Sequence, residues 1–316
     1  MKRRTIAGLT STVAAAVLVI TASIVWPGLD AQETPEVDTS VWALQTGEGQ
    51  RYARVNTTVG ELDTVRTAGN PSQVAQGPEG AYLFTDGYSK IARIDEAQPV
   101  DLQEEQLDSA PDTPPGTTSV VTAGDYVVYR TDTGALYASR LSRAGQSVTE
   151  LDPFGTAGDD DARSYTADAV AVDARGMLFA YSSADGSVIR YDIEADELKG
   201  RDALQVDVAS PVLTAAGDQW VLVDADAGRV WVRGHDPVDL DTTDQLIVGD
   251  PDPRGDAVYL ADDQSLWSVP VDGGEPRREV GAGGNVLGQP AKPLAHDGVA
   301  YAAWLLPGDA RGTLWR

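Results

Sequence analysis

The chain repeats one pattern about every forty residues. Each repeat has an apolar run rich in Val, Tyr, Trp and Leu, a short turn rich in Gly and Asp, and a second run in which apolar and polar side chains alternate. The segment "LFAYSSADGSVIRYDI" (178–193) shows the pattern most clearly. Successive repeats start 41, 44, 52, 42, 38 and 41 residues apart, measured between Val41, Tyr82, Tyr126, Leu178, Trp220, Val258 and Val299.

Each pair of runs predicts a β-hairpin, because turns such as Asp185-Gly186 tolerate the positive φ that tight hairpins require. A short apolar run such as "PSQVAQG" (71–77) precedes most hairpins, and a weaker acidic run such as "QPVDL" (98–102) or "PRREV" (276–280) follows. This order gives four strands per unit. A single sheet of this kind cannot bury both faces, whereas sheets packed face to face around an axis can. We therefore predict an all-β fold, a β-propeller of about seven four-stranded blades. An array of β-sandwiches would repeat at about a hundred residues instead.

The first and last units are incomplete in strand count. The first lacks an inner strand, because the acidic segment 30–40 leads directly into Val41, and the last stops within its third strand at "GTLWR". We expect the propeller, residues 41–316, to lack its closing strands at the C-terminus, and roughly twenty to thirty further residues to supply them, about half of one propeller repeat. Closure by side-chain packing alone is the alternative.

The N-terminal segment, residues 1–29, has the pattern of a membrane anchor. Lys2, Arg3 and Arg4 precede the charge-free run 6–26, which as a helix spans roughly 31 Å, about one hydrocarbon core. Trp26 lies where an interfacial aromatic residue is expected. The basic residues place the N-terminus in the cytoplasm, so we expect a single-pass membrane protein with a short acidic stalk (30–40) and an extracytoplasmic propeller.

Two other interpretations of this segment remain open. A signal peptide cleaved after Ala31 would give a secreted protein, although Leu29 at the third position before the cut is not a small residue. The adjacent Arg3 and Arg4 also resemble part of a twin-arginine export signal, which Ala7 and Gly8 continue poorly.

Charge and composition exclude several classes of function. The formal net charge is −25, and residues after 29 carry 21 basic against 49 acidic side chains. Such a chain repels phosphate backbones, so no nucleic acid is expected as a partner. The absence of cysteine excludes disulfides, thiolate zinc sites and cysteine nucleophiles.

Motifs that carry chemistry are scarce. No Gly-x-Ser-x-Gly, phosphate-binding glycine loop or His-Glu-x-x-His occurs. His235 and His296 each precede an Asp but fall in different repeats, and Asp224 and Asp226 suggest at most a weak calcium contact at one turn. The tripeptide Arg-Gly-Asp at 254–256 is explained by chance in a chain rich in Arg and Asp. We predict no cofactor, no metal site and no catalytic residue.

Propeller enzymes place their acids and bases around the mouth of the central channel, near the inner strands. The alignment of repeats puts four polar residues nearest to that position: Gln73, Asp168, Gln289 and Lys292.

Three segments together resemble one group of proteins. They are "KRRTIAG" before the anchor, "VWALQTGEGQRYARVNTTVGELD" (41–63) after the stalk, and "VAYAAW" (299–304) followed by the terminal "WR". The chain resembles large actinobacterial cell-surface proteins with a membrane anchor, an N-terminal propeller and then tandem immunoglobulin-like or fibronectin type III domains. No such array follows here. Turns such as "TDTGALYAS" are also similar to propeller repeats of the pyrroloquinoline-quinone type, which indicates blades and not the cofactor.

These observations favour a non-catalytic extracytoplasmic propeller, tethered to the cell membrane, that binds an envelope or cell-surface protein or polymer. The alternative is an extracytoplasmic propeller enzyme (a hydrolase, lyase or quinoprotein) with its site at the channel mouth. A third interpretation is a scaffold that assembles other envelope proteins, for which pairing through an exposed strand edge would be the signature.

Overall fold

A computed structural model gives the structure of ten segments of the chain. The chain forms two compact units. One comprises Val41–Val55 and Leu62–Arg316 and holds the sheets, and the other comprises Met1–Ser40 and Asn56–Glu61. The segments described are 40–45, 50–56, 61–96, 100–146, 148–153, 165–242, 244–281, 286–296, 299–306 and 312–316. The predicted anchor and nearly all of the stalk, with Lys2, Arg3, Arg4 and Trp26, lie outside these residues. No helix within them is long and apolar enough to cross a membrane.

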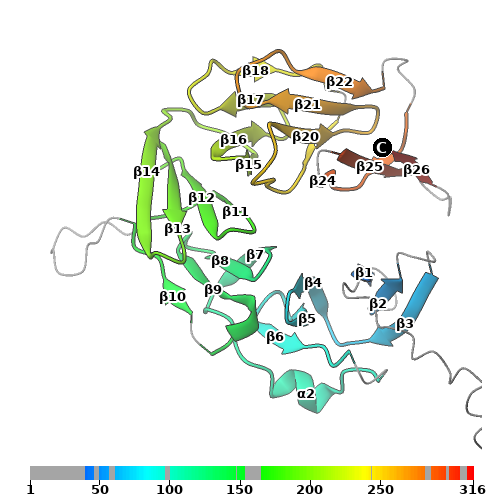
Figure 1. The fold of residues 1–316 in the computed structure, drawn as a ribbon. Helices are drawn as coiled ribbons and strands as arrows, with labels where there is room; N and C mark the ends of the chain where they lie inside the picture. Colours follow the sequence, from blue (N-terminus) through cyan, green and yellow to red (C-terminus); the bar gives the residue numbers. More distant parts are fainter. Residues whose placement is uncertain are drawn as a thin grey trace, which may run out of the picture. The chain divides into compact units, whose positions relative to one another are not determined.

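Seven antiparallel sheets follow one another in chain order (Figure 1), which confirms the predicted all-β, seven-bladed propeller. The third to sixth sheets have four strands each, as the repeat predicts. Their strands are β7 (Thr117–Ala123), β8 (Tyr126–Thr131), β9 (Leu136–Arg140) and β10 (Thr149–Glu150); β11 (Ala169–Val172), β12 (Met177–Ser182), β13 (Ser187–Asp192) and β14 (Glu197–Ala203); β15 (Pro211–Ala216), β16 (Gln219–Asp224), β17 (Arg229–Val232) and β18 (Val238–Asp239); β19 (Ile247–Val248), β20 (Ala257–Ala261), β21 (Leu266–Pro270) and β22 (Arg277–Val280).

The remaining sheets depart from this plan. The first pairs three strands in the order β1-β2-β3, the second pairs β4-β5-β6, and the seventh is built around β25, which pairs with β23, β24 and β26. The bounds are β1 (Val41–Gln45), β2 (Arg51–Asn56), β3 (Glu61–Thr67), β4 (Pro71–Gly77), β5 (Gly80–Thr85), β6 (Lys90–Arg93), β23 (Gln289–Pro290), β24 (Leu294–His296), β25 (Val299–Leu305) and β26 (Gly312–Trp315). Strand β26 is the last strand in the described part of the seventh sheet.

One predicted strand is wrong. The run "QPVDL" (98–102) is not a strand in its described part, and the short helix α2 (Glu104–Asp108) follows it. The fourth-strand position beside β6 is taken instead by residues 111–113, where Lys90 and Asp112 form an isolated bridge. Ile91 N–H donates to the Pro111 carbonyl, and Thr113 N–H donates to the Ser89 carbonyl. Within the described segments, the other short helical element is the 3-10 turn η1 (Leu141–Arg143).

Hairpin turns form where the sequence places Gly after Asp or Thr. Gly186, between β12 and β13, has φ +55°, and Gly134, between β8 and β9, has φ +81°. Both values lie in the left-handed region that Gly enters without strain. The strands on either side of Gly186 pair in a continuous register from Ser182 with Ser187 to Met177 with Asp192.

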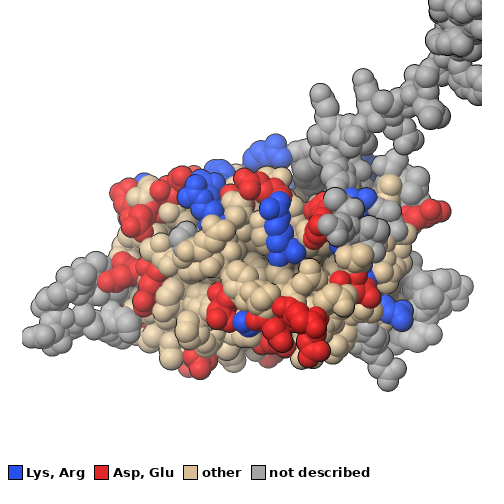
Figure 2. Space-filling view, turned by 90° about the horizontal axis from the view of Figure 1, so that it is seen from below, with Lys and Arg blue, Asp and Glu red and all other residues tan. Residues whose placement is uncertain are grey.

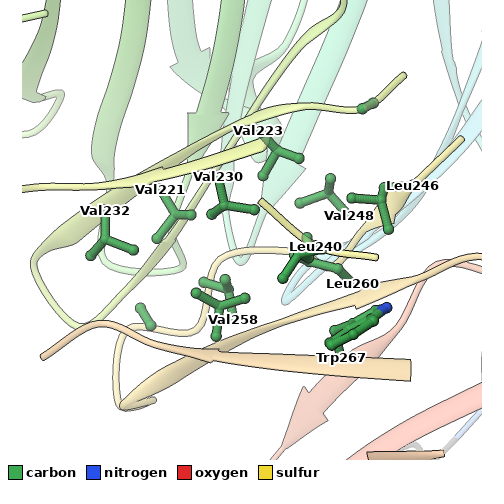
Figure 3. Close-up of a cluster of buried hydrophobic side chains, with 13 residues drawn as sticks. Val221, Val223, Val230, Val232, Leu240, Leu246, Val248, Val258, Leu260 and Trp267 are labelled. Atoms are coloured by element: carbon green, nitrogen blue, oxygen red, sulfur yellow. The ribbon is translucent and has the colours of Figure 1, made fainter. Parts of the chain in front are cut away.

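Apolar side chains fill the junctions between consecutive sheets. Six clusters of buried residues are present in the described part of the chain, one at each junction from the first and second sheets to the sixth and seventh. Figure 3 shows the cluster between the fifth and sixth sheets, where Val221, Val223 and Val230 meet Val258 and Leu260. Full burial of one such side chain contributes about 1.5–3 kcal/mol, so these junctions hold the sheets together.

Most charged side chains lie at the surface; among the described residues, Arg66, Asp173, Asp224 and Asp262 are buried. Figure 2 shows one face of the molecule, where Asp and Glu gather in several groups with Lys and Arg between them.

Candidate functional site

The four positions predicted at a channel mouth lie on three different sheets. Gln73 lies in β4, Asp168 immediately precedes β11, Gln289 lies in β23, and Lys292 follows it. Asp168 accepts a hydrogen bond from the Ser183 backbone N–H at 2.7 Å. Lys292 Nζ donates to Asp250 Oδ1 at 2.7 Å. The contact of Asp168 therefore lies within the fourth sheet, whereas Lys292 reaches a residue next to the sixth sheet, and a site made by all four residues stays a prediction.

The two histidines lie on different sheets. His235 is exposed in the turn after β17, in the fifth sheet, and His296 ends β24 in the seventh, with its side chain outside the described atoms. Among the described residues, no group of three or more His, Cys, Asp or Glu side chains could hold a metal ion.

Many of the aspartates close turns through hydrogen bonds to the backbone. Asp173 accepts hydrogen bonds from the N–H groups of Arg175 and Met177 at 2.8 and 2.9 Å. Asp224 accepts one from the Ala227 N–H, and Asp226 accepts hydrogen bonds from the Ser210 hydroxyl and the Gln245 amide. Asp224 thus takes part in turn formation, a common role of Asp, whereas Asp226 links this turn to two segments that are distant in sequence.

A groove of about 630 Å³ lies between the fourth and fifth sheets. At its centre, Asp202 Oδ2 lies 2.8 Å from Arg233 Nε and accepts a hydrogen bond from Trp220 Nε1 at 2.9 Å. Arg190 Nε lies 3.9 Å from the same carboxylate oxygen. The other lining residues are Arg201, Ala203, Leu204, Gln219, Trp231, Val232, Gly234 and His235.

A smaller groove, of about 300 Å³, lies between the third and fourth sheets. Arg140 pairs there with Asp125 at 3.3 Å and with Glu194, and its guanidinium lies 5.2 Å from the ring centre of Tyr126. The hydrogen bond to Asp125 raises the pKa of Arg140, and burial raises the pKa of Tyr126. In both grooves a basic side chain on one sheet pairs with a carboxylate on its neighbour, so these charges join sheets to one another.

Exposed apolar side chains concentrate on the two end sheets. Nine large apolar residues are exposed in the described part of the chain, and six of them lie in strands of the first or seventh sheet. The nine are Val41, Leu62, Val65, Val100, Val286, Leu294, Leu305, Leu306 and Leu314. The most exposed is Leu314 in β26, at 72%.

The register of the seventh sheet places its exposed residues on one face. Leu294 is opposite Tyr301, and Leu314 is opposite Ala303. Residues directly opposite one another point to the same side of a sheet, as do residues two apart in a strand. This face, called the apolar end face below, therefore comprises Leu294, Tyr301, Ala303, Leu305 and Leu314. Ala302 and Trp304 point the other way, into the cluster shared with the sixth sheet.

The first sheet has a similar outward face. Trp42 packs in the cluster shared with the second sheet, and Arg66 lies over its ring at 5.3 Å. Val41, which is opposite Val55, and Val65 alternate with these two residues and point away from them. Sequence analysis did not identify either end face, because the alternation in each strand was assigned to hairpin formation alone.

Comparison with known proteins shows the fold only. No protein-family model matches the chain, and no curated protein is similar to it in sequence. The computationally designed Ika8 protein matches with a TM-score of 0.53 and 14% identity, over 88% of this chain and 81% of that one. A streptogramin B lyase matches with a TM-score of 0.52 and 10% identity over 84% and 87%, and a chain of the mitotic checkpoint complex with 0.51 and 12% over 84% and 81%. An enzyme, a checkpoint assembly and a designed protein thus share this architecture, and the chain is a seven-bladed β-propeller of a kind that serves more than one function.

Proposed function

We propose that this chain is a non-catalytic binding module of the cell envelope, held at the membrane by residues 6–26 with its propeller outside the cytoplasm. The partner is a cell-surface or envelope protein. This proposal agrees with the resemblance to anchored actinobacterial surface proteins. The lyase among the structural neighbours shares only the fold, so it lends no weight to the enzymatic alternative.

The observation that supports binding is the apolar end face of the seventh sheet. Leu294, Leu305 and Leu314 are each more than half exposed and lie on one side of one sheet. A contiguous exposed apolar surface on a folded domain is typical of a protein-binding site. The strands of this sheet, β23, β24, β25 and β26, include no Asp or Glu, although Asp297 and Asp309 stand in the connections between them. A neutral patch on so acidic a chain lowers the barrier to approach by a partner.

A capture experiment tests this function. The full chain, its Leu305→Lys/Leu314→Lys variant and a Val100→Lys control are immobilised and exposed to envelope extract, and bound proteins are quantified by mass spectrometry. Val100 is a matched control because it is similarly exposed but lies outside the seventh sheet. We expect the same partner on the native chain and the control, with about a tenfold loss on the double variant, equivalent to about 1.4 kcal/mol. Equal recovery on all three chains would refute binding through this face.

The orientation is tested separately, with protease added to intact cells. We expect residues 41–316 to be degraded without lysis. Protection of the propeller until the membrane is broken would place it in the cytoplasm and overturn the proposed location.

A further inference from the structure

The groove between the fourth and fifth sheets contains more hydrogen-bond donors than the protein uses. Arg190 lies in β13, and Arg233 follows β17. Their Nε atoms lie 3.9 and 2.8 Å from the same carboxylate oxygen of Asp202. Neither guanidinium donates a hydrogen bond to another described residue, and the Nε of Arg190 is buried without a partner there. Because each guanidinium has five N–H donors, most of these donors remain available to a ligand.

The strand register of the fourth sheet directs Arg190 towards the fifth sheet. Val188, which is opposite Asp202, packs in the cluster shared with the fifth sheet. Arg190 is two residues further along β13 and therefore points to the same side. Gly200 is opposite Arg190, and a Cβ there would lie 2.5 Å from Nη2 of that arginine. The glycine thus leaves the space that the guanidinium occupies.

Arg233 approaches the groove from the fifth sheet, next to an apolar lining. Trp231 packs in the cluster shared with the fourth sheet, and Arg233, two residues later, points to the same side. The side chain of Arg233 is 29% exposed, so a ligand in the groove can reach it. The apolar residues that line the groove are Ala203, Leu204, Trp220, Trp231 and Val232.

The local charge is opposite in sign to that of the chain. Arg190, Arg233 and Asp202 sum to +1, whereas the formal net charge of the chain is −25. Arg201 also lines the groove, but its guanidinium donates to the Ser187 hydroxyl and the Asp185 carbonyl, so it is not counted. Two guanidiniums that share one carboxylate favour a second anion, which a planar N–H fork binds through two hydrogen bonds.

We propose that this groove binds a small organic anion, a carboxylate or phosphate group joined to an apolar body. Arg190 and Arg233 hold the anionic group, and the apolar body contacts the lining around Trp220 and Trp231. The volume of about 630 Å³ is in the range of small-molecule sites, which combine an apolar lining with a few polar groups. The site goes beyond the proposed function, because it lies on the fourth and fifth sheets and shares no residue with the apolar end face.

The test compares three radiolabelled probes of similar size by equilibrium dialysis. Phenylacetate carries the anion, phenylacetamide has nearly the same shape without the charge, and phenyl phosphate replaces the carboxylate by a phosphate. The full chain is used in lipid nanodiscs, with empty nanodiscs as the blank. We expect at least one of the two anions to bind at least about tenfold more tightly than phenylacetamide. The tighter of the two assigns the ligand to the carboxylates or to the phosphates.

Variants of the chain locate the binding. Arg233→Gln should weaken binding of the anion about tenfold. Arg229→Gln is the matched control, because Arg229 lies in the same strand but pairs with Asp239 at 3.5 Å and does not line the groove, so binding should be unchanged. Asp202→Asn removes the competing charge and keeps an oxygen for the Trp220 Nε1–H, so it should strengthen binding about threefold. Because these effects have opposite signs, loss of folding in one variant cannot produce both.

Three results would overturn this inference. If neither anion bound above the blank, or if both bound no better than phenylacetamide, the two arginines would serve only to join the fourth and fifth sheets. Anion binding that Arg233→Gln and Asp202→Asn leave unchanged, in variants with the far-ultraviolet circular dichroism of the native chain, would place the site elsewhere. The capture experiment decides separately on the apolar end face, so failure of one proposal does not count against the other.

Discussion

Two buried tryptophans provide a sharp test of the packing at the end of the propeller. Trp304 is fully buried between the sixth and seventh sheets, and its Nε1–H donates to the Asp262 carbonyl at 2.8 Å. Trp267 is also buried, between the fifth and sixth sheets, but its Nε1–H has no hydrogen-bond partner among the described residues. Substitution by Phe removes the same atoms at both positions and changes hydrogen bonding in opposite directions.

The expected difference follows from those two donors. Trp304→Phe loses a buried hydrogen bond, which adds about 1–2 kcal/mol to the cost of the smaller ring. Trp267→Phe removes an unpartnered buried donor, and relief of its desolvation offsets part of the lost packing, by about 1 kcal/mol. The Arg278 guanidinium lies 4.4 Å from the ring centre of Trp267 and would interact more weakly with the smaller Phe ring. This loss reduces the relief by about 0.5 kcal/mol. The free energy of unfolding should therefore fall by about 2 kcal/mol more for Trp304→Phe.

Urea unfolding followed by far-ultraviolet circular dichroism measures this difference. With a denaturant slope of about 2.5 kcal/mol/M, a difference of about 2 kcal/mol separates the two midpoints by about 0.8 M. The native chain and a Trp304→Ala variant, expected to lose about 3–5 kcal/mol, bracket the range. If Trp267→Phe proved as destabilising as Trp304→Phe, the reasoning from donor satisfaction would be refuted.

Two further predictions concern the junction between the third and fourth sheets and the alkaline limit of stability. Gly176 has φ +86°, and a Cβ there would lie 2.6 Å from Cζ of Tyr126. Gly176→Ala should therefore lower the free energy of unfolding, measured by urea titration, by about 3 kcal/mol. The control Gly87→Ala, at φ +64° with open space around it, should lower it by only about 1 kcal/mol. Burial raises the pKa of Tyr129 to about 12, above its ordinary value of 10. The contribution of the neutral Tyr129 to the free energy of unfolding is therefore complete below pH 10 and is lost as the pH rises towards 12. This loss should reach about 2–3 kcal/mol, so the alkaline fall in the free energy of unfolding should be smaller by that amount in Tyr129→Phe, where Tyr165 and Tyr191, whose pKa values burial also raises, still contribute; an unchanged alkaline profile in that variant would contradict the assignment.

The strands were predictable from sequence where hydrophobic alternation and turn chemistry agree. Strand β4 occupies the predicted run 71–77, and Gly186 adopts the positive φ expected of its turn. The prediction failed at 98–102, where the run "QPVDL" suggested a strand but residues 111–113 take the place beside β6. The choice between two segments for one edge depends on tertiary contacts, such as burial of Leu107 from α2, which local propensity does not contain.

The functional surface was less predictable than the fold. The alternation of "VAYAAWL" identifies β25 as a strand but does not say which of its faces a neighbouring sheet covers. That depends on how many sheets pack together and in what order. At Asp224 and Asp226, where the sequence suggested at most a weak calcium contact, the carboxylates accept hydrogen bonds from the Ala227 N–H and the Gln245 amide, and the spacing of the two residues does not reveal these partners.

The apolar end face of the seventh sheet follows from the repeat. Each repeat must make both faces of its sheet apolar, because an interior sheet packs on two neighbours. The seventh sheet keeps this apolar face, and because Leu294, Leu305 and Leu314 remain exposed there, it is the surface that the fold offers to a partner. The absence of charge in β26 follows from repetition too, since β21, the third strand of the sixth sheet, has the sequence Leu-Trp-Ser-Val-Pro and is also uncharged. Exposure of the face is therefore the informative feature, and the capture experiment with Leu305→Lys/Leu314→Lys and Val100→Lys tests it directly.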